Sequence, residues 1–229
     1  IMSKDWTKIR AKVKDFIESE IYPKETELAK GTPEAREMLG SLMQLAKDEK
    51  IWALGHPEDI GGGGMPFMEY VYVNEVIGRS SFAMVALGTH SLQDSIMLRE
   101  FASPHWRDQY LEPLVQGEIF PSFGMTEPDV ASSDPTQLQT TAILDNGTWK
   151  INGTKWFTTG AARAAYTTVM CRTELDAPSH GAFSMIIVPT DNPGYKIVRE
   201  TPVLGINGGH YEVKYDNVEV PEENLLGPR

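Results

Sequence analysis

The spacing of apolar residues changes once along this chain of 229 residues, near Gly117. Before that point apolar side chains recur every three or four residues, as on one face of a helix, beginning with Trp6 and Val13. After it, apolar and polar residues alternate, as they do along a half-buried strand. The change predicts a chain of two parts: an all-helical domain over residues 1–117 and an all-β barrel or sandwich over residues 118–229.

Prolines mark where helices are expected to begin and end in the first part. Pro23 is expected to end the first helix, because proline lacks the N–H that a helix interior needs. Thr32-Pro33 combines an N-cap with a proline in the first turn, and Pro66 opens a further helix. This further helix is expected to carry Phe67, Tyr70, Val71, Asn74 and Ile77 on one side.

Asn-Gly pairs mark the turns of the second part. Asp145-Asn146-Gly147 and then Asn152-Gly153 each follow an alternating run, so they predict two hairpins in succession. Further strands are expected over residues 166–172, 183–188, 195–198 and 211–220.

Composition and charge exclude several classes of protein. The net charge of −11 opposes a phosphate polyanion, so nucleic acid is not an expected partner. No apolar run is long enough to span a bilayer. Cys171 is the only cysteine, which excludes an intrachain disulfide and favours a small buried side chain in a reducing compartment. The first residues have no apolar signal core, so we expect a cytoplasmic protein, or a matrix or peroxisomal one in a eukaryote, rather than a secreted one.

Two runs in the β part carry the residue types that a flavin nucleotide requires. FGMTEPDVASSD, residues 123–134, is a small-residue turn with several hydroxyls, which suits a pyrophosphate. INGTKWFTTGAA, residues 151–162, brings Trp156 close to Thr158, which suits a flat ring that needs an aromatic wall and hydrogen-bond partners at its edge. Taken singly, each run is also typical of an ordinary hairpin or strand end.

Two more runs make the pattern specific. RDQYLEPLVQGEI, residues 107–119, and GGHYEVKYDNVEVPEENLLG, residues 208–227, flank the first two, and the four together resemble the acyl-CoA dehydrogenase family in content and order. The motif MTEPDVASSD, together with the later motif GGH, most resembles the branch that includes the tenth and eleventh human members. The resemblance implies the family's helical N-terminal domain followed by its β-barrel middle domain. A third, helical domain follows in the family, so we expect this chain to be a fragment, a split subunit or a truncated product.

The resemblance also implies an activity. It is the FAD-dependent α,β-dehydrogenation of an acyl-CoA thioester, as in fatty acid β-oxidation, in which a carboxylate takes the α-proton while a hydride passes to the flavin. Electron-transfer flavoprotein is the implied electron acceptor, and a homo-oligomer or a partner chain that supplies the third domain is the implied assembly. Two alternatives stay open: a flavin oxidase or monooxygenase on the same scaffold, and a catalytically silent scaffold protein.

Specific residues take roles from the resemblance. The Met125 backbone and the Thr126 hydroxyl are expected at the pyrimidine end of the flavin, and Thr158 near its N5 atom. Trp156 is expected against the ring. The remaining expected contacts are Ser132, at the pyrophosphate and beside the thioester, and, more weakly, Phe123 and Phe157. Where many members have Gly-Ala-Gly-Ser, this chain has Asp-Val-Ala-Ser over residues 129–132, so glycine flexibility does not carry over.

No catalytic residue is expected in this chain. Glu127 lies in the flavin-facing run, but Pro128 follows it in a turn, so a solvated or backbone-bonded structural carboxylate is expected there. The family's base is expected from the missing third domain. His90 and His210 lack the spacing to other ligands that a metal site needs.

Overall fold

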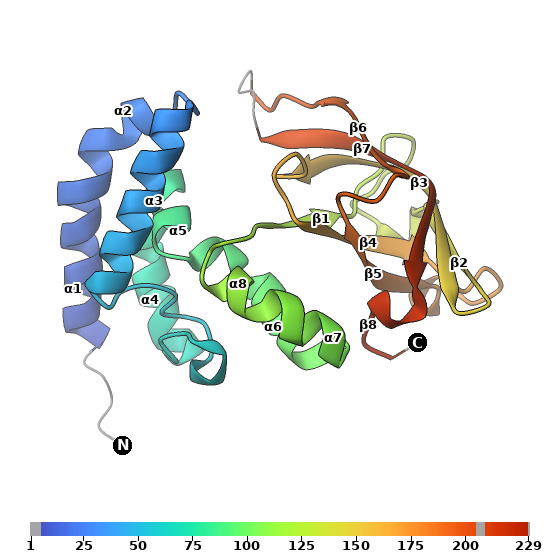
Figure 1. The fold of residues 1–229 in the computed structure, drawn as a ribbon, viewed down its shortest axis with the longest axis horizontal. Coiled ribbons are helices and arrows are strands. Elements are labelled where there is room, and N and C mark those ends of the chain that lie inside the picture. The colour runs from blue at the N-terminus through green and yellow to red at the C-terminus, as the bar shows by residue number, and fades with distance from the viewer. Residues whose placement is uncertain (1–5, 205–208, 229) are drawn as a thin grey trace. The chain divides into compact units, whose positions relative to one another are not determined.

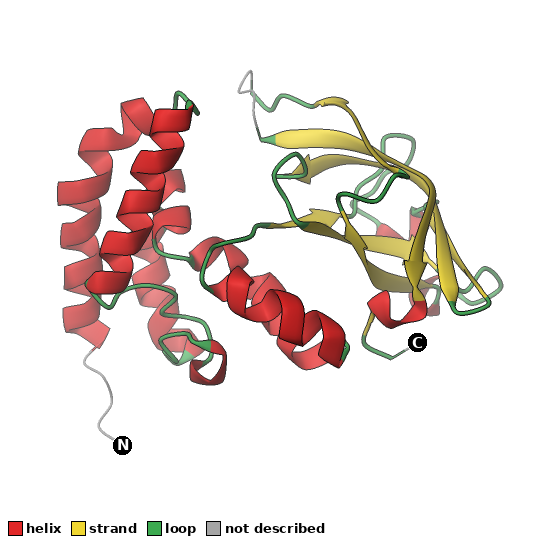
Figure 2. Cartoon of the chain, in the orientation of Figure 1, coloured by secondary structure: helices red, strands yellow, loops and turns green. Residues whose placement is uncertain are grey.

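A computed structural model of the chain describes residues 6–204 and 209–228. It shows helices followed by a β-sheet (Figure 1; Figure 2), which confirms the expected fold class. The chain divides into two compact units, one of Ile1–Ile96 with Val115–Gly117 and the other of Met97–Leu114 with Glu118–Arg229. The helical residues 97–114 therefore belong to the same unit as the strands.

The first helical run continues past Pro23. α1 (Trp6–Phe16) leads into a π-helical turn (Ile17–Ile21), a 3₁₀ turn (Tyr22–Lys24) and α2 (Glu25–Leu28). The prediction that Pro23 ends the helix was wrong. Proline is tolerated because it lies in the first turn of the 3₁₀ segment, where its missing N–H is not needed.

The next helices begin where the sequence predicts. Thr32 caps α3 (Pro33–Asp48), and its Oγ1 accepts a hydrogen bond from the Ala35 N–H at 3.3 Å. α4 (Phe67–Ile77) follows Pro66, and α5 (Ser81–Ala86) follows it. Of the residues expected on one side of α4, Tyr70 and Ile77 are buried, whereas Phe67 is 73% exposed. Apolar residues stand on nearly every side of α4, so their spacing does not select one face.

A second group of helices packs on the sheet within its unit. It comprises the end of α6 (Leu92–Phe101), α7 (Pro104–Trp106), a π-helical turn (Arg107–Leu111) and α8 (Glu112–Val115). Trp106 is buried against Tyr166 and Ile187, and its indole N–H donates to Asn224 Oδ1 at 3.2 Å. Asn224 Nδ2 in turn donates to the Ile187 carbonyl at 2.8 Å, so this contact leaves no polar atom of the amide unpaired.

The strands form one mixed sheet with the order β6-β7-β3-β2-β4-β5-β8, and β1 pairs in parallel with β4. Their bounds are β1 Pro121–Gly124, β2 Thr141–Asp145, β3 Thr148–Thr159, β4 Tyr166–Arg172, β5 Phe183–Pro189, β6 Tyr195–Glu200, β7 His210–Pro221 and β8 Leu225–Leu226. Side chains of the inner face, among them Trp149, Val169 and Tyr215, form the core of this unit. Cys171 is buried there as predicted, and burial raises the pKa of its thiol to about 12.

One of the two predicted hairpins exists. Asn146 and Gly147, with φ of 50° and 77°, form the two-residue turn between β2 and β3. The second prediction was wrong, because β3 runs straight through Asn152-Gly153 and only shifts register there against β7. Gly153 serves close packing: a Cβ at this position would lie 2.3 Å from Thr140 Oγ1.

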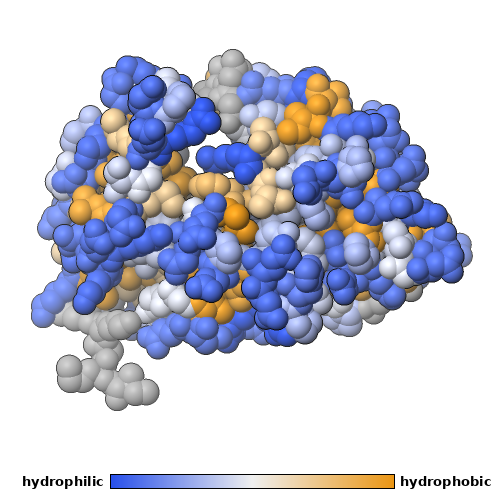
Figure 3. Space-filling view, viewed as in Figure 1, coloured by the Kyte–Doolittle hydropathy of each residue, from blue (hydrophilic) through white to orange (hydrophobic). Residues whose placement is uncertain are grey.

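The surface is mostly hydrophilic on the face that Figure 3 draws. Apolar residues form small separate groups there. Within the described ranges, no helix is long and apolar enough to cross a membrane.

Candidate functional site

A break in β3 shapes the region that the sequence singles out. Lys155 pairs with Val213 of β7, and the next pair is Thr158 with Tyr211, so β3 carries one extra residue between them. Phe157 occupies this bulge in the left-handed region, with φ of 48°. The bulge turns the backbone of Trp156 away from β7 and leaves it available to another segment.

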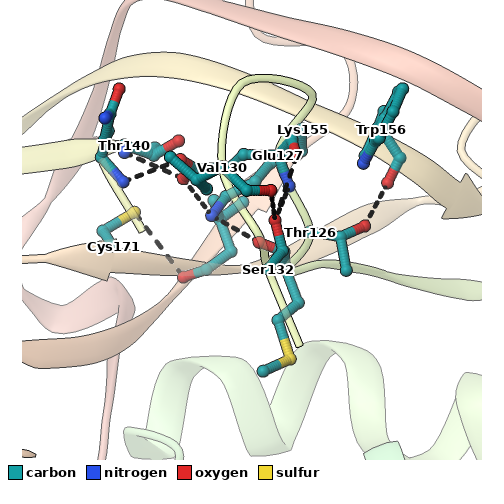
Figure 4. Close-up of polar contacts among 11 residues, drawn as sticks. Thr126, Glu127, Val130, Ser132, Thr140, Lys155, Trp156 and Cys171 are labelled. Atoms are coloured by element: carbon teal, nitrogen blue, oxygen red, sulfur yellow. Dashed lines mark hydrogen bonds and ion pairs between the residues drawn. The ribbon is translucent and has the colours of Figure 1, made fainter. Parts of the chain in front are cut away.

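That other segment follows β1. The Trp156 N–H donates to the Thr126 carbonyl at 2.9 Å, and the Thr126 hydroxyl donates to the Trp156 carbonyl at 2.8 Å. Figure 4 shows the second of these bonds, with both residues on the same side of the loop. The structure thus brings together the two runs that the sequence selects, although 30 positions separate the two residues.

The tip of the bulge presents aromatic side chains. Phe157 is 42% exposed and Trp156 is half-buried, and their ring centroids lie 4.8 Å apart at 57°. Thr158 comes next and is fully buried. Its Oγ1 makes no hydrogen bond to any part of the chain that the structure describes. A ligand atom at this place could supply a partner, and among the described residues Thr168 and Thr201 also have buried hydroxyls without one.

The remaining predicted residues lie on the same loop or on β1. Ser132 is buried, and its Oγ accepts from the Glu127 N–H at 2.7 Å and lies 3.0 Å from the Glu127 carbonyl. Its hydroxyl therefore closes a local turn, and a contact with a pyrophosphate stays a prediction. Phe123 lies on β1 opposite Thr168, and the Met125 carbonyl accepts from Lys155 Nζ at 2.8 Å.

Glu127 is held in an ion pair that the sequence analysis missed. Lys155 Nζ lies 2.8 Å from Glu127 Oε1, and the two side chains are 0% and 5% exposed. Backbone N–H groups complete the carboxylate's bonding: Gln139 donates to Oε2 at 2.7 Å and Thr140 to Oε1 at 2.9 Å. The expectation of a backbone-bonded structural carboxylate is confirmed, while that of a solvated one is not.

Both charges are shifted by their surroundings. Burial raises the pKa of Glu127, but the Lys155 ammonium and the donated N–H groups outweigh this, so the net pKa lies below its usual value. Burial lowers the pKa of Lys155, and the Glu127 carboxylate opposes that shift. A carboxylate held in its charged form by three donors is a poor proton acceptor.

The sequence did carry a signal for Lys155. Trp149, Ile151, Gly153 and Lys155 follow one another at a spacing of two, so strand alternation places the lysine on the core face. A lysine on that face requires a buried partner of opposite charge.

Potential metal ligands and the pocket described in the first unit were compared with the position of these residues. No group of three potential metal ligands occurs among the described residues. The pocket, of about 470 Å³, is lined by residues such as Lys47, Lys50 and Trp52, and contains none of the residues predicted from the sequence.

Comparison with known proteins covers nearly the whole chain. The family profile "Acyl-CoA dehydrogenase, N-terminal domain" matches residues 3–118, and "Acyl-CoA dehydrogenase, middle domain" matches residues 122–218. FadE2 of Mycobacterium tuberculosis, named as an acyl-CoA dehydrogenase, is 38% identical over 95% of this chain and 56% of its own length. Acyl-CoA dehydrogenase family member 10 of Mus musculus is 34% identical over 96% of this chain and 22% of its own length.

A solved structure gives the same result. A Mycobacterium abscessus structure named as an acyl-CoA dehydrogenase superposes with a TM-score of 0.90 and 32% identity, over 99% of this chain and 61% of its own. The chain therefore spans about a fifth to three-fifths of the length of these relatives.

Proposed function

Because the chain belongs to the acyl-CoA dehydrogenase family, we propose that it is the flavin-contacting part of an FAD-dependent acyl-CoA dehydrogenase. The observation that carries the proposal is the pairing of Thr126 with Trp156 at the β3 bulge. It joins the two runs expected at the flavin and leaves half-buried Trp156 and exposed Phe157 beside the Thr158 hydroxyl, which has no partner among the described residues.

The residues present fit a flavin. Trp156 and Phe157 offer apolar ring surface, and Thr158 offers a hydroxyl that has no partner within residues 6–204 and 209–228. Thr126 uses its hydroxyl hydrogen on Trp156, so toward a ligand it acts as an acceptor. When bound, a flavin supplies the acceptor for a hydride. The chain's own part is to hold the ring, shield one face and restrict solvent at the bulge.

The proton acceptor of the reaction is proposed to lie outside residues 1–229. Glu127, the carboxylate next to Thr126, has both oxygens occupied by Lys155 and two backbone N–H groups. Acyl-CoA as substrate, electron-transfer flavoprotein as electron acceptor and assembly into an oligomer are proposed from family membership alone.

The experiment that tests the proposal is flavin binding by the purified 229-residue chain. FAD is titrated against the chain, and flavin absorption is followed through gel filtration, with FMN as the control for the adenylate half. We expect FAD to stay with the protein and to bind more tightly than FMN. A chain that retains no flavin, even with acyl-CoA present, contradicts the proposal and favours a scaffold protein.

A second assay concerns the reaction. The FAD-loaded chain is offered acyl-CoAs of several lengths and an electron-accepting dye. We expect no dye reduction at enzyme-like rates, because a missing general base costs about 10²- to 10⁴-fold. Substrate-dependent reduction by the chain alone would place the base within it. Rapid reaction of the reduced flavin with oxygen would instead favour an oxidase or monooxygenase.

A further inference from the structure

The ion pair of Glu127 and Lys155 is costly in itself. Moving either charge out of water is strongly unfavourable, and the two side chains together expose almost nothing. A pair this deeply buried is maintained only where further hydrogen bonds satisfy both ions. The position of those further bonds shows what the pair does.

The pair closes the connection between β1 and β2 at its base. Lys155 Nζ holds the start of the connection through the Met125 carbonyl at 2.8 Å. Glu127 holds its end through the N–H groups of Gln139 and Thr140. Both ends of this loop are thereby tied to a single position on β3, as Figure 4 shows for Glu127, Thr140 and Lys155.

The same position controls the candidate site. Lys155 is the last residue of β3 in register with β7 before the bulge, and Trp156 follows it immediately. Because side chains alternate along a strand, Lys155 points into the core while Trp156 lies on the other face. Any movement of Lys155 is therefore transmitted to Trp156 and, through their two hydrogen bonds, to Thr126.

We propose that Glu127 and Lys155 are a positioning pair, which closes the 125–140 loop at its base and so fixes Thr126 against Trp156 for the flavin. The inference rests on the proposed function. It assigns the pair no contact with flavin or substrate. The hydrogen bonds made by the two side chains determine the position of the loop. The stability of the fold depends instead on whether each buried charge has a partner of opposite charge.

A set of three variants distinguishes the effect of the hydrogen bonds from the effect of charge pairing. Lys155→Met and Glu127→Gln each leave one uncompensated buried charge, and the double variant leaves none. We expect both single variants to lower the melting temperature markedly and the double variant to recover most of the loss. The double variant still lacks the bond to the Met125 carbonyl, and its glutamine NH₂ cannot accept from a backbone N–H.

The expected signature is thus recovery of stability without recovery of flavin binding. In the double variant we expect FAD affinity to stay about 10-fold or more below wild type. The absorption and visible circular dichroism of the bound flavin should shift, and the Gln139 and Thr140 amides should exchange hydrogen faster. The control is the exposed pair Lys196 and Asp216 on β6 and β7: Lys196→Met with Asp216→Asn should change neither property.

The outcomes are distinct. A wild-type chain that binds no FAD overturns the proposed function and the positioning role with it. A wild-type chain that binds FAD, combined with a folded double variant of equal affinity and unchanged flavin spectrum, overturns the positioning role alone. If the single variants do not fold, the double variant decides, because it carries no unpaired charge.

Discussion

Thr126 and Trp156 are joined by two hydrogen bonds: the Thr126 hydroxyl donates to the Trp156 carbonyl, and the Trp156 backbone N–H donates to the Thr126 carbonyl. The bonds join the segment that follows β1 to the bulge in β3. They also give the threonine hydroxyl a defined direction, because its hydrogen is committed to the Trp156 carbonyl. Its free lone pair is the part available to a ligand.

Removing that hydroxyl tests the bond. We expect Thr126→Val to weaken FAD binding by roughly fivefold, because one neutral hydrogen bond contributes about 1 kcal/mol. Thr126→Ser keeps the hydroxyl and should bind FAD nearly as the wild type does. FAD titration of both variants checks this, and equal affinities for valine and serine would contradict it.

Thr158 gives a different expectation, because its buried hydroxyl has no partner within the described ranges. Thr158→Val should leave the stability of the flavin-free chain unchanged or raise it, since it removes an unsatisfied polar group. The same change should weaken FAD binding by about fivefold.

Thr168→Val is the matched control, because Thr168 is also buried and its hydroxyl has no partner in the part of the chain that the structure describes, but it lies on β4. It should affect stability in the same direction and leave FAD binding unchanged. Thermal unfolding and FAD titration of both variants separate the two roles, and an equal loss of affinity would remove Thr158 from the site.

Trp156 and Trp149 should respond to truncation in opposite ways. Trp149 is fully buried on β3, so Trp149→Ala should cost about 3–5 kcal/mol of stability. Trp156 is half-buried beside exposed Phe157, so Trp156→Ala should cost less stability and more flavin affinity. Denaturant unfolding together with FAD titration checks both expectations. A larger affinity loss for a folded Trp149→Ala would contradict the site.

Stability should depend on pH through two residues of the helical unit. His56 is buried, and burial lowers its pKa from 6.5 to about 4. The unfolded chain then binds a proton that the folded chain does not, so stability is complete above pH 6.5 and falls as the pH drops toward 4. His56→Asn should flatten this acid limb in thermal unfolding experiments.

Asp94 has the opposite sign. Its Oδ1 is buried and has no hydrogen-bond partner among the described residues, and burial raises the pKa of Asp94 from 3.8 to about 7. The folded chain holds a proton that the unfolded chain releases, so stability falls as the pH rises from 3.8 toward 7. Asp94→Asn should raise stability by a few kcal/mol at about pH 8 and by much less at about pH 4. A uniform gain at both pH values would contradict this assignment.

The strands were predictable because their patterns are local. The run 166–172 coincides with β4, since alternation and β-propensity act over a few residues. Asn152-Gly153 gave a wrong hairpin prediction, because a glycine also suits a place where another residue approaches the backbone closely, here the Thr140 side chain. The pairing of Thr126 with Trp156 could not be derived from residue patterns, because it depends on a bulge whose register is set by β7. The family resemblance placed both residues at one ligand without giving their mutual contacts.

Because the 125–140 loop is closed at its base, its tip should tolerate substitution and insertion. Since Met125, Gln139 and Thr140 are tied to side chains of the ion pair, the exposed residues around Asp134 can vary without moving the ends. Lengthening a loop whose ends are already fixed adds only about 0.6 kcal/mol for each doubling. A reporter peptide inserted near exposed Asp134 should thus leave β1 and β3 in place, offering a handle for labelling this face of the protein.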